Sequence, residues 1–133
     1  MKKLVVVIIM LLLGLPSFAQ STETGYVTVK WDAVEPCCTP MQYYVCITVM
    51  RVSDRVTIIE DLCELVSYSV LEYQFEFEFP CATPNEQFQV FASVKAGCEG
   101  PPLVECESGT NSGENASCAD LTGGDFEMEV LLQ

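Results

Sequence analysis

Cysteine thiols are the most reactive side chains in this chain, and the sequence contains eight of them. Metal binding by thiolates usually shows as Cys-x-x-Cys pairs, often together with histidine. No two of these cysteines have that spacing and the chain has no histidine, so the pattern argues against a zinc or redox centre. It favours up to four disulfides, with the pairing left open, among Cys37, Cys38, Cys46, Cys63, Cys81, Cys98, Cys106 and Cys118.

Oxygen ligands for a hard cation such as Ca²⁺ are concentrated near the C-terminus. The candidates are Asn111, Glu114, Asp120 and Asp125. Their spacing matches no EF-hand, so an ordinary polar loop is the favoured interpretation and calcium binding is the alternative. No other cofactor is predicted.

Enzymatic chemistry finds little support in the residue types. Without histidine, the Ser-His-Asp and Cys-His arrangements are excluded, and no glycine-rich phosphate loop is present. Glu76 and Glu78 could form an acid/base pair, but they alternate with phenylalanines and are expected on the solvated face of a strand. We therefore expect a protein that is not an enzyme.

The N-terminus has the pattern of a secretory signal peptide. Lys2 and Lys3 precede an apolar run over residues 4–13, and residues 17–19 (Ser-Phe-Ala) offer a cleavage site after Ala19. The run is too short to span a bilayer. We expect residues 1–19 to be removed and the mature protein to be secreted, periplasmic or on the cell surface, with no membrane span.

The mature part, residues 20–133, is long enough for one domain and too short for two. It carries four basic residues against nineteen acidic ones, a net charge of −15. Such a surface repels phosphate backbones, so nucleic acid is excluded as a partner. It would attract cations or basic proteins, but an ordinary solvated acidic surface is the favoured interpretation.

Period-two alternation of apolar and polar residues predicts strands over most of the chain. The strand over residues 42–51 is the most strongly indicated, because it is rich in β-branched and aromatic residues and has apolar side chains on both faces. Further strands are expected at residues 26–32, 56–59, 73–79, 87–95 and 126–132. The predicted core includes Trp31, Tyr43, Val45, Ile47, Phe75, Phe77, Phe88 and Val90.

Two segments lack a clear period. Residues 60–71 begin like a helix-capping box at Asp61 and Glu64 but end in strand-like alternation, and we interpret them as an irregular connection. Residues 98–125 are rich in Ser, Gly, Asn and acids, which predicts a long loop bracketed by cysteines. The expected fold is thus an all-β, disulfide-stapled sandwich of two antiparallel sheets in a single domain.

Three sequence stretches resemble the fibronectin type III domain, an immunoglobulin-like sandwich. They are residues 27–32 (Val-Thr-Val-Lys-Trp-Asp), residues 42–45 (Gln-Tyr-Tyr-Val), and residues 84–92 with the glycines that follow at 97 and 100. The resemblance implies that Trp31 is the core tryptophan of the second strand and that Tyr43 opens the third strand. It also places Phe88 where the family usually has a tyrosine.

The resemblance also implies that residues 33–40 and 97–102 emerge at the same end of the sandwich, where Cys37 or Cys38 could reach Cys98 or Cys106. Only residues 20–25 precede residue 26 after cleavage, which is too little for the family's first strand. That edge could stay open, be closed by the C-terminal segment, or be filled by another chain.

Domains of this family mostly act as spacers or binding platforms. We therefore expect an exported binding or adhesion module that contacts a protein or a cell-surface glycan through the loops at 33–40 and 97–125. The alternative is a structural subunit that assembles by β-strand addition at the open edge.

Overall fold

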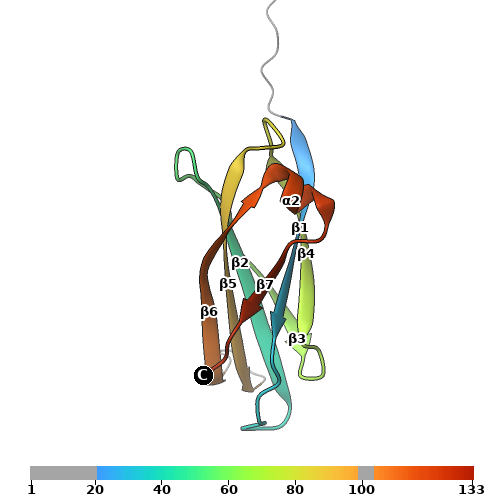
Figure 1. The fold of residues 1–133 in the computed structure, drawn as a ribbon. Coiled ribbons are helices and arrows are strands. Elements are labelled where there is room, and N and C mark those ends of the chain that lie inside the picture. Colours follow the sequence, from blue (N-terminus) through green and yellow to red (C-terminus); the bar gives the residue numbers. More distant parts are fainter. Residues whose placement is uncertain (1–20, 99–103) are drawn as a thin grey trace, which may run out of the picture.

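The fold consists of two β-sheets that pack face to face, as seen in a computed structural model that describes residues 21–98 and 104–133 (Figure 1). The first sheet has the strand order β4-β1-β7 and comprises β1 (Thr22–Trp31), β4 (Glu72–Pro80) and β7 (Glu127–Val130). The second has the order β3-β2-β5-β6 and comprises β2 (Met41–Arg51), β3 (Thr57–Ser67), β5 (Gln87–Cys98) and β6 (Val104–Ser117). A short helix, α2 (Cys118–Gly123), connects β6 to β7. The predicted signal peptide at residues 1–19 lies outside the described residues.

The core lies between the sheets and follows the alternation of the sequence. In β2, every second residue from Met41 to Val49 is buried, and β4 and β5 show the same period. All eight residues expected in the core are buried, at 7% exposure or less. The predicted all-β, disulfide-stapled sandwich is therefore confirmed, and its strand pairs are antiparallel with one exception.

The exception is the pairing of β7 with β1, which is parallel and joins residues 28–31 to residues 127–130. Beyond this pairing, the Thr28 amide donates to the carbonyl of Phe126 at 3.0 Å, and α2 packs against β1. The edge that the family's first strand would cover could be open, closed by the C-terminal segment, or filled by another chain. The structure shows closure by the C-terminal segment. It completes the sheet beside β1 without a second chain.

Strand β3 covers residues 60–67 of the irregular connection expected at residues 60–71, so that interpretation is wrong for this part, while residues 68–71 form no strand or helix. Its period is hidden by an irregularity: pairing with β2 shifts between Ile47 and Val49, opposite Asp61, whose φ is 44°. The Asp61 amide donates to Thr48 Oγ1 at 3.2 Å, as part of this irregular strand pairing and not of a helix cap. Because β3 is an edge strand with no fully buried residue, its sequence carries little core signal.

Strand β6 and helix α2 occupy most of the segment expected to be a long loop. Residues 104–117 pair with β5 along almost their whole length, although only Ala116 is buried. Ser, Gly and Asn have low strand propensity, and here the tertiary pairing overrides it. The helix starts at a capping box, in which Ser117 Oγ accepts from the Asp120 amide at 3.1 Å and Asp120 Oδ2 accepts from the Ser117 amide at 2.9 Å.

Gly109 allows the C-terminal segment to cross β6 in close contact. A Cβ atom at this position would lie 1.9 Å from the backbone oxygen of Leu131. Just beside it, the amide of Gln133 donates to the Ser108 carbonyl at 3.1 Å. The absence of a side chain is therefore a condition for closing this side of the sandwich.

We expect Gly109→Ala to lower the free energy of unfolding by about 1–3 kcal/mol, because the backbone must move to relieve the clash. Urea denaturation measures the change. The control is Gly123→Ala, where a new Cβ would have no atom within 4 Å. Equal stability of the two variants would show that the C-terminal segment does not lie against β6.

Candidate functional site

Two disulfides tie together three segments at the lower end of the sandwich in Figure 1. They join Cys37 to Cys106 and Cys38 to Cys98, with Cα–Cα separations of 6.2 and 5.9 Å. Cys37 and Cys38 lie in the connection between β1 and β2, Cys98 ends β5, and Cys106 sits at a register shift of β6. The pairs belong to the set that the resemblance implied. We call this arrangement the double clamp.

The other two disulfides are placed elsewhere. Cys46–Cys63 joins directly opposed residues of β2 and β3 with a Cα–Cα separation of 4.1 Å. Cys81–Cys118 joins the segment after β4 to the first residue of α2, at 6.1 Å, and both residues are buried. The helix that covers part of β1 is thus fixed covalently to the sandwich.

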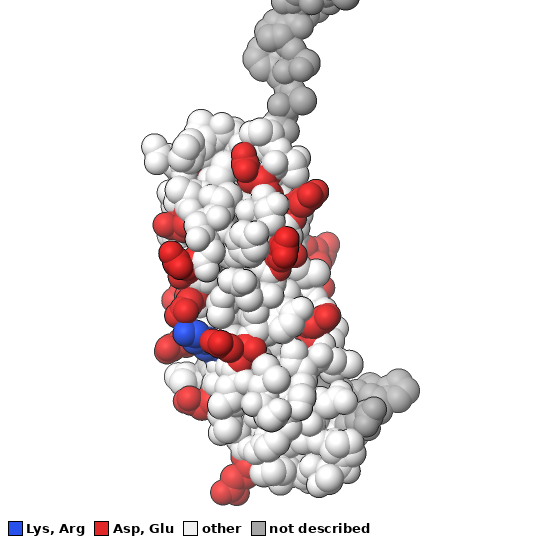
Figure 2. Space-filling view, turned by 90° about the vertical axis from the view of Figure 1, so that its right-hand side faces the viewer, with Lys and Arg blue, Asp and Glu red and all other residues white. Residues whose placement is uncertain are grey.

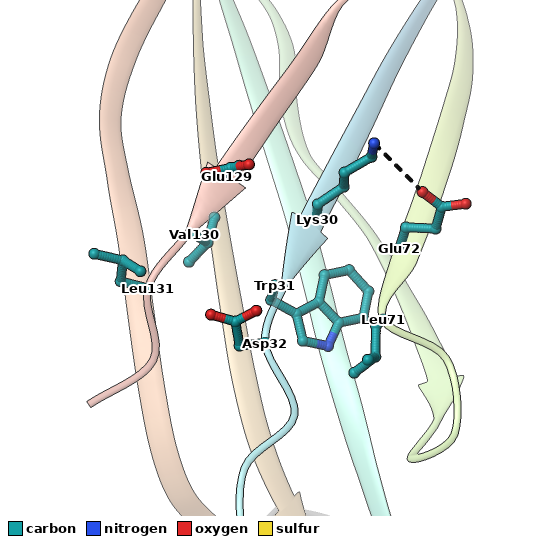
Figure 3. A pocket seen from close by; sticks show the side chains of 8 residues that line it. All are labelled: Lys30, Trp31, Asp32, Leu71, Glu72, Glu129, Val130 and Leu131. Atoms are coloured by element: carbon teal, nitrogen blue, oxygen red, sulfur yellow. Dashed lines mark ion pairs between the residues drawn. The ribbon is translucent and has the colours of Figure 1, made fainter.

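A hollow of about 310 Å³ opens where the first sheet ends (Figure 3). It lies at the same end of the sandwich as the double clamp, because Cys37 and Cys38 belong to the connection that leaves the end of β1. It is formed by the ends of β1 and β7 and the start of β4, because Lys30 pairs with Glu72 and Trp31 pairs with Val130. Its lining residues are Lys30, Trp31, Asp32, Leu71, Glu72, Glu129, Val130 and Leu131.

The charge in this hollow is mainly negative. The ammonium group of Lys30 is already engaged, with Glu127 at 2.9 Å and Glu72 at 3.9 Å. The hydrogen bond to Glu127 is the main reason why the pKa of Lys30 is raised. Asp32 and Glu129 have no ion pair in the described part of the chain. The hollow therefore offers two carboxylates to hydroxyl or ammonium groups, beside the apolar Leu71 and Leu131.

An aromatic cluster supports the floor of the hollow. The ring of Trp31 packs against Tyr43, whose ring stacks on Tyr68, with centroid separations of 5.3 and 5.8 Å. The Tyr68 hydroxyl donates to the carbonyl of Val34, which holds the connection after β1. Trp31 Nε1 and the Tyr43 hydroxyl are buried without a hydrogen-bond partner among residues 21–98 and 104–133. Burial raises the pKa of Tyr43.

We expect Tyr43→Phe to leave the free energy of unfolding at neutral pH unchanged or to raise it by up to about 1 kcal/mol, because it removes an unpartnered buried hydroxyl. Since the folded chain holds this proton more tightly, the wild type should lose stability as the pH rises above about 10. The variant should lose less. Urea denaturation at pH 7 and at alkaline pH tests both points, and a lower stability of Tyr43→Phe at pH 7 would contradict them.

The geometry on its own does not place the chain in a known group. No family model, no curated protein and no solved structure matches this chain. The described residues also include no helix with the length and apolar character needed to cross a bilayer. Any functional conclusion must therefore come from the residues and their arrangement.

The residues considered for calcium do not gather at one point. Asn111 and Glu114 lie on β6, and the Asn111 side-chain amide donates to the carbonyl of Glu129 at 3.0 Å. Asp120 is used in the capping box, where the Ser117 amide lowers its pKa, and it lines a shallow hollow with Asp125. Among the described residues, the carboxylates of Glu114, Asp120 and Asp125 form no group that could hold an ion.

Acidic side chains are spread over the side of the molecule that carries β4. Figure 2 shows them along the length of this surface, with basic atoms gathered at one place only. Glu76 and Glu78 are exposed on the outer face of β4. The sequence indicated this surface but missed the hollow, because its lining comes from the ends of three strands that no local pattern connects.

Proposed function

We propose that the mature chain is an exported, non-enzymatic binding or adhesion module of the fibronectin type III-like kind. Its partner is a protein or a cell-surface glycan, and it contacts that partner through the end that carries the double clamp and the hollow. Export is supported by the N-terminal pattern and by the four disulfides, which persist in oxidising compartments.

The main support for this proposal is that a rigidly held connection and a hollow lined with carboxylates lie together at the end of the sandwich that carries the double clamp. The connection between β1 and β2 has little regular structure, yet two disulfides and the Tyr68 hydroxyl hold it. Loops on a rigid scaffold lose little entropy on binding, so they suit recognition. The expected contact region changes in one respect, because residues 104–117 of the expected loop form β6. Residues 99–103 of that loop lie outside the described residues, and the described contact region consists of residues 32–40 and the hollow.

The chemistry of the hollow defines what a partner must present. Asp32 and Glu129 accept hydrogen bonds, and Lys30 is neutralised by its two glutamates. Sugar hydroxyls or the basic side chains of a protein satisfy these acceptors. Leu71, 41% exposed, and Leu131, 70% exposed, add apolar contact area.

The test is binding of the labelled mature protein to a glycan array and to proteins of the outer envelope. We expect Asp32→Ala combined with Glu129→Ala to weaken binding at least tenfold. The matched control is Glu76→Ala combined with Glu78→Ala, which removes the same charge from the same sheet away from the hollow. Binding that survives the first pair of substitutions and is lost with the second would refute this site.

Assembly by strand addition is less well supported than the sequence suggested. The edge that motivated it, beside β1, is occupied by β7 of the same chain and covered by α2. We therefore expect the mature protein to elute as a monomer in size-exclusion chromatography. Concentration-dependent oligomers would restore the assembly hypothesis.

A further inference from the structure

The double clamp gathers four sulfur atoms that are far apart in the sequence. The Sγ atoms of Cys37, Cys38, Cys98 and Cys106 all lie within 4.8 Å of one another. In the described part of the chain, no other group of three or more cysteine, aspartate or glutamate side chains comes together in this way. The spacing of the cysteines along the sequence argued against a thiolate site. In the fold, however, the pairing of β5 with β6 and the connection after β1 bring the four sulfur atoms close together.

The arrangement is close to what a tetrahedral metal site requires. Zinc–thiolate bonds are about 2.3 Å long, so the sulfurs of a tetrahedral site lie about 3.8 Å apart. After reduction, the two sulfurs of each former disulfide must separate from about 2 Å to about 3.8 Å, and the other sulfur pairs, all within 4.8 Å, must approach by about 1 Å or less. Each sulfur therefore needs to move by only about 1 Å. No change of strand register is needed.

The elements that carry the sulfurs can supply such a shift. Cys98 pairs with Val104, and Cys106 lies at the register shift between the paired residues Glu105 and Glu107 of β6. Cys37 and Cys38 belong to residues 32–40, which form no strand or helix. Two ligands on a firm support and two on an adjustable segment allow the site to close around an ion without disturbing the core.

We infer that the double clamp, once reduced, is a binding site for one thiophilic d¹⁰ cation, with Zn²⁺ as the ligand to test. Four sulfur ligands select such ions over calcium or magnesium. The same segment is then held by either of two crosslinks: two disulfides under oxidising conditions, or one metal ion under reducing conditions. The excess of acidic residues raises the local concentration of cations.

The conversion is balanced with a dithiol as the reductant. Two dithiol molecules transfer four electrons and four protons to the two disulfides, giving four cysteine thiols and two cyclic disulfides. Binding of Zn²⁺ then replaces the four thiol protons, which are released to solvent. In the reverse direction, two cyclic disulfides accept four electrons from the thiolates and take up four protons to become two dithiols, while the cysteines re-form the two bridges and Zn²⁺ is released.

The experiment compares oxidised and phosphine-reduced mature protein in titrations with Zn²⁺, read by native mass spectrometry, and with Co²⁺, read by the visible absorption of tetrahedral thiolate complexes. We expect one equivalent of metal per reduced chain and none per oxidised chain. Affinity should rise with pH, because binding releases protons. Failure of the reduced chain to bind Zn²⁺ would overturn the inference.

Variants are compared in the reduced state, where no substitution removes a crosslink. Cys37→Ser combined with Cys38→Ser should weaken Zn²⁺ binding at least 100-fold. Cys46→Ser combined with Cys63→Ser, and Cys81→Ser combined with Cys118→Ser, should leave it within about twofold. An equal loss in all three pairs would mean that the metal binds to thiols of a disordered chain, and would also overturn the inference. Binding of a glycan or protein partner by the oxidised chain is unaffected by either result.

Discussion

Replacing all four double-clamp cysteines by serine is expected to lower the free energy of unfolding by about 7 kcal/mol, whereas breaking either bridge alone should cost about 3 kcal/mol. The difference arises from the unfolded chain. The bridges span sequence separations of 69 and 60 residues and connect almost the same points. While one is intact, the other closes only a short additional loop. When both are absent, the whole segment between residues 37 and 106 gains conformational entropy in the unfolded state.

Urea denaturation of the oxidised variants measures these costs, and the free energies form a double-mutant cycle. Three variants are needed: Cys37→Ser with Cys106→Ser, Cys38→Ser with Cys98→Ser, and all four substitutions together. Cys46→Ser with Cys63→Ser is the control, since it opens a loop of separation 17 in another part of the sheet. Its cost should add to that of either clamp bridge. Strict additivity within the clamp would show that the two bridges do not share a loop.

Phe88→Ala is expected to lower the free energy of unfolding by about 3–5 kcal/mol, because it empties space in a closely packed core. Phe88 is fully buried at the start of β5, and its ring packs edge-on against Phe79 with centroids 5.2 Å apart. The loss combines transfer of the ring from a dry interior with the cavity that remains. Thermal and urea denaturation should give concordant values.

The matched control is Phe91→Ala, three residues further along the same strand. Phe91 points to the outer face of the sheet and is only half-buried. Its loss should cost about 1–2 kcal/mol, less than that of Phe88, since part of its surface is already in water and no closed cavity forms. If the two variants were equally unstable, the assignment of inner and outer faces in β5 would be wrong, and with it the core between the sheets.

The strands with one fully buried face were predictable, because each residue type there matches its own environment. In β2 and β4, alternate side chains lie in the core, so buried apolar residues recur at every second position of the sequence. The two edge strands of the second sheet, β3 and β6, were not predictable in this way. In β3 the shift near Asp61 breaks the period, and in β6 only Ala116 reaches the core. Their conformation is set by the neighbour with which they pair, and that information is not local.

The candidate site was likewise predictable only where a local sequence pattern indicated it. The number of cysteines and the predicted signal peptide led us to expect disulfides. The pairing of the cysteines, however, depends on how β5 and β6 are placed against the connection after β1. The hollow was missed altogether, since Lys30, Glu72 and Glu129 become neighbours only through strand pairing. The oxygen-rich tail suggested a calcium site, yet its polar residues lie along β6, in the helix cap and in the loop after α2.

The parallel pairing of β1 with β7 determines when the first sheet can be completed during folding. Residues 22–31 and residues 127–130 lie about a hundred positions apart in the sequence, so the first sheet is incomplete until the two ends of this segment meet. Pairing across such a distance forms slowly. Until residues 127–130 pair with β1, that edge of the first sheet is open, so we expect this contact to form last.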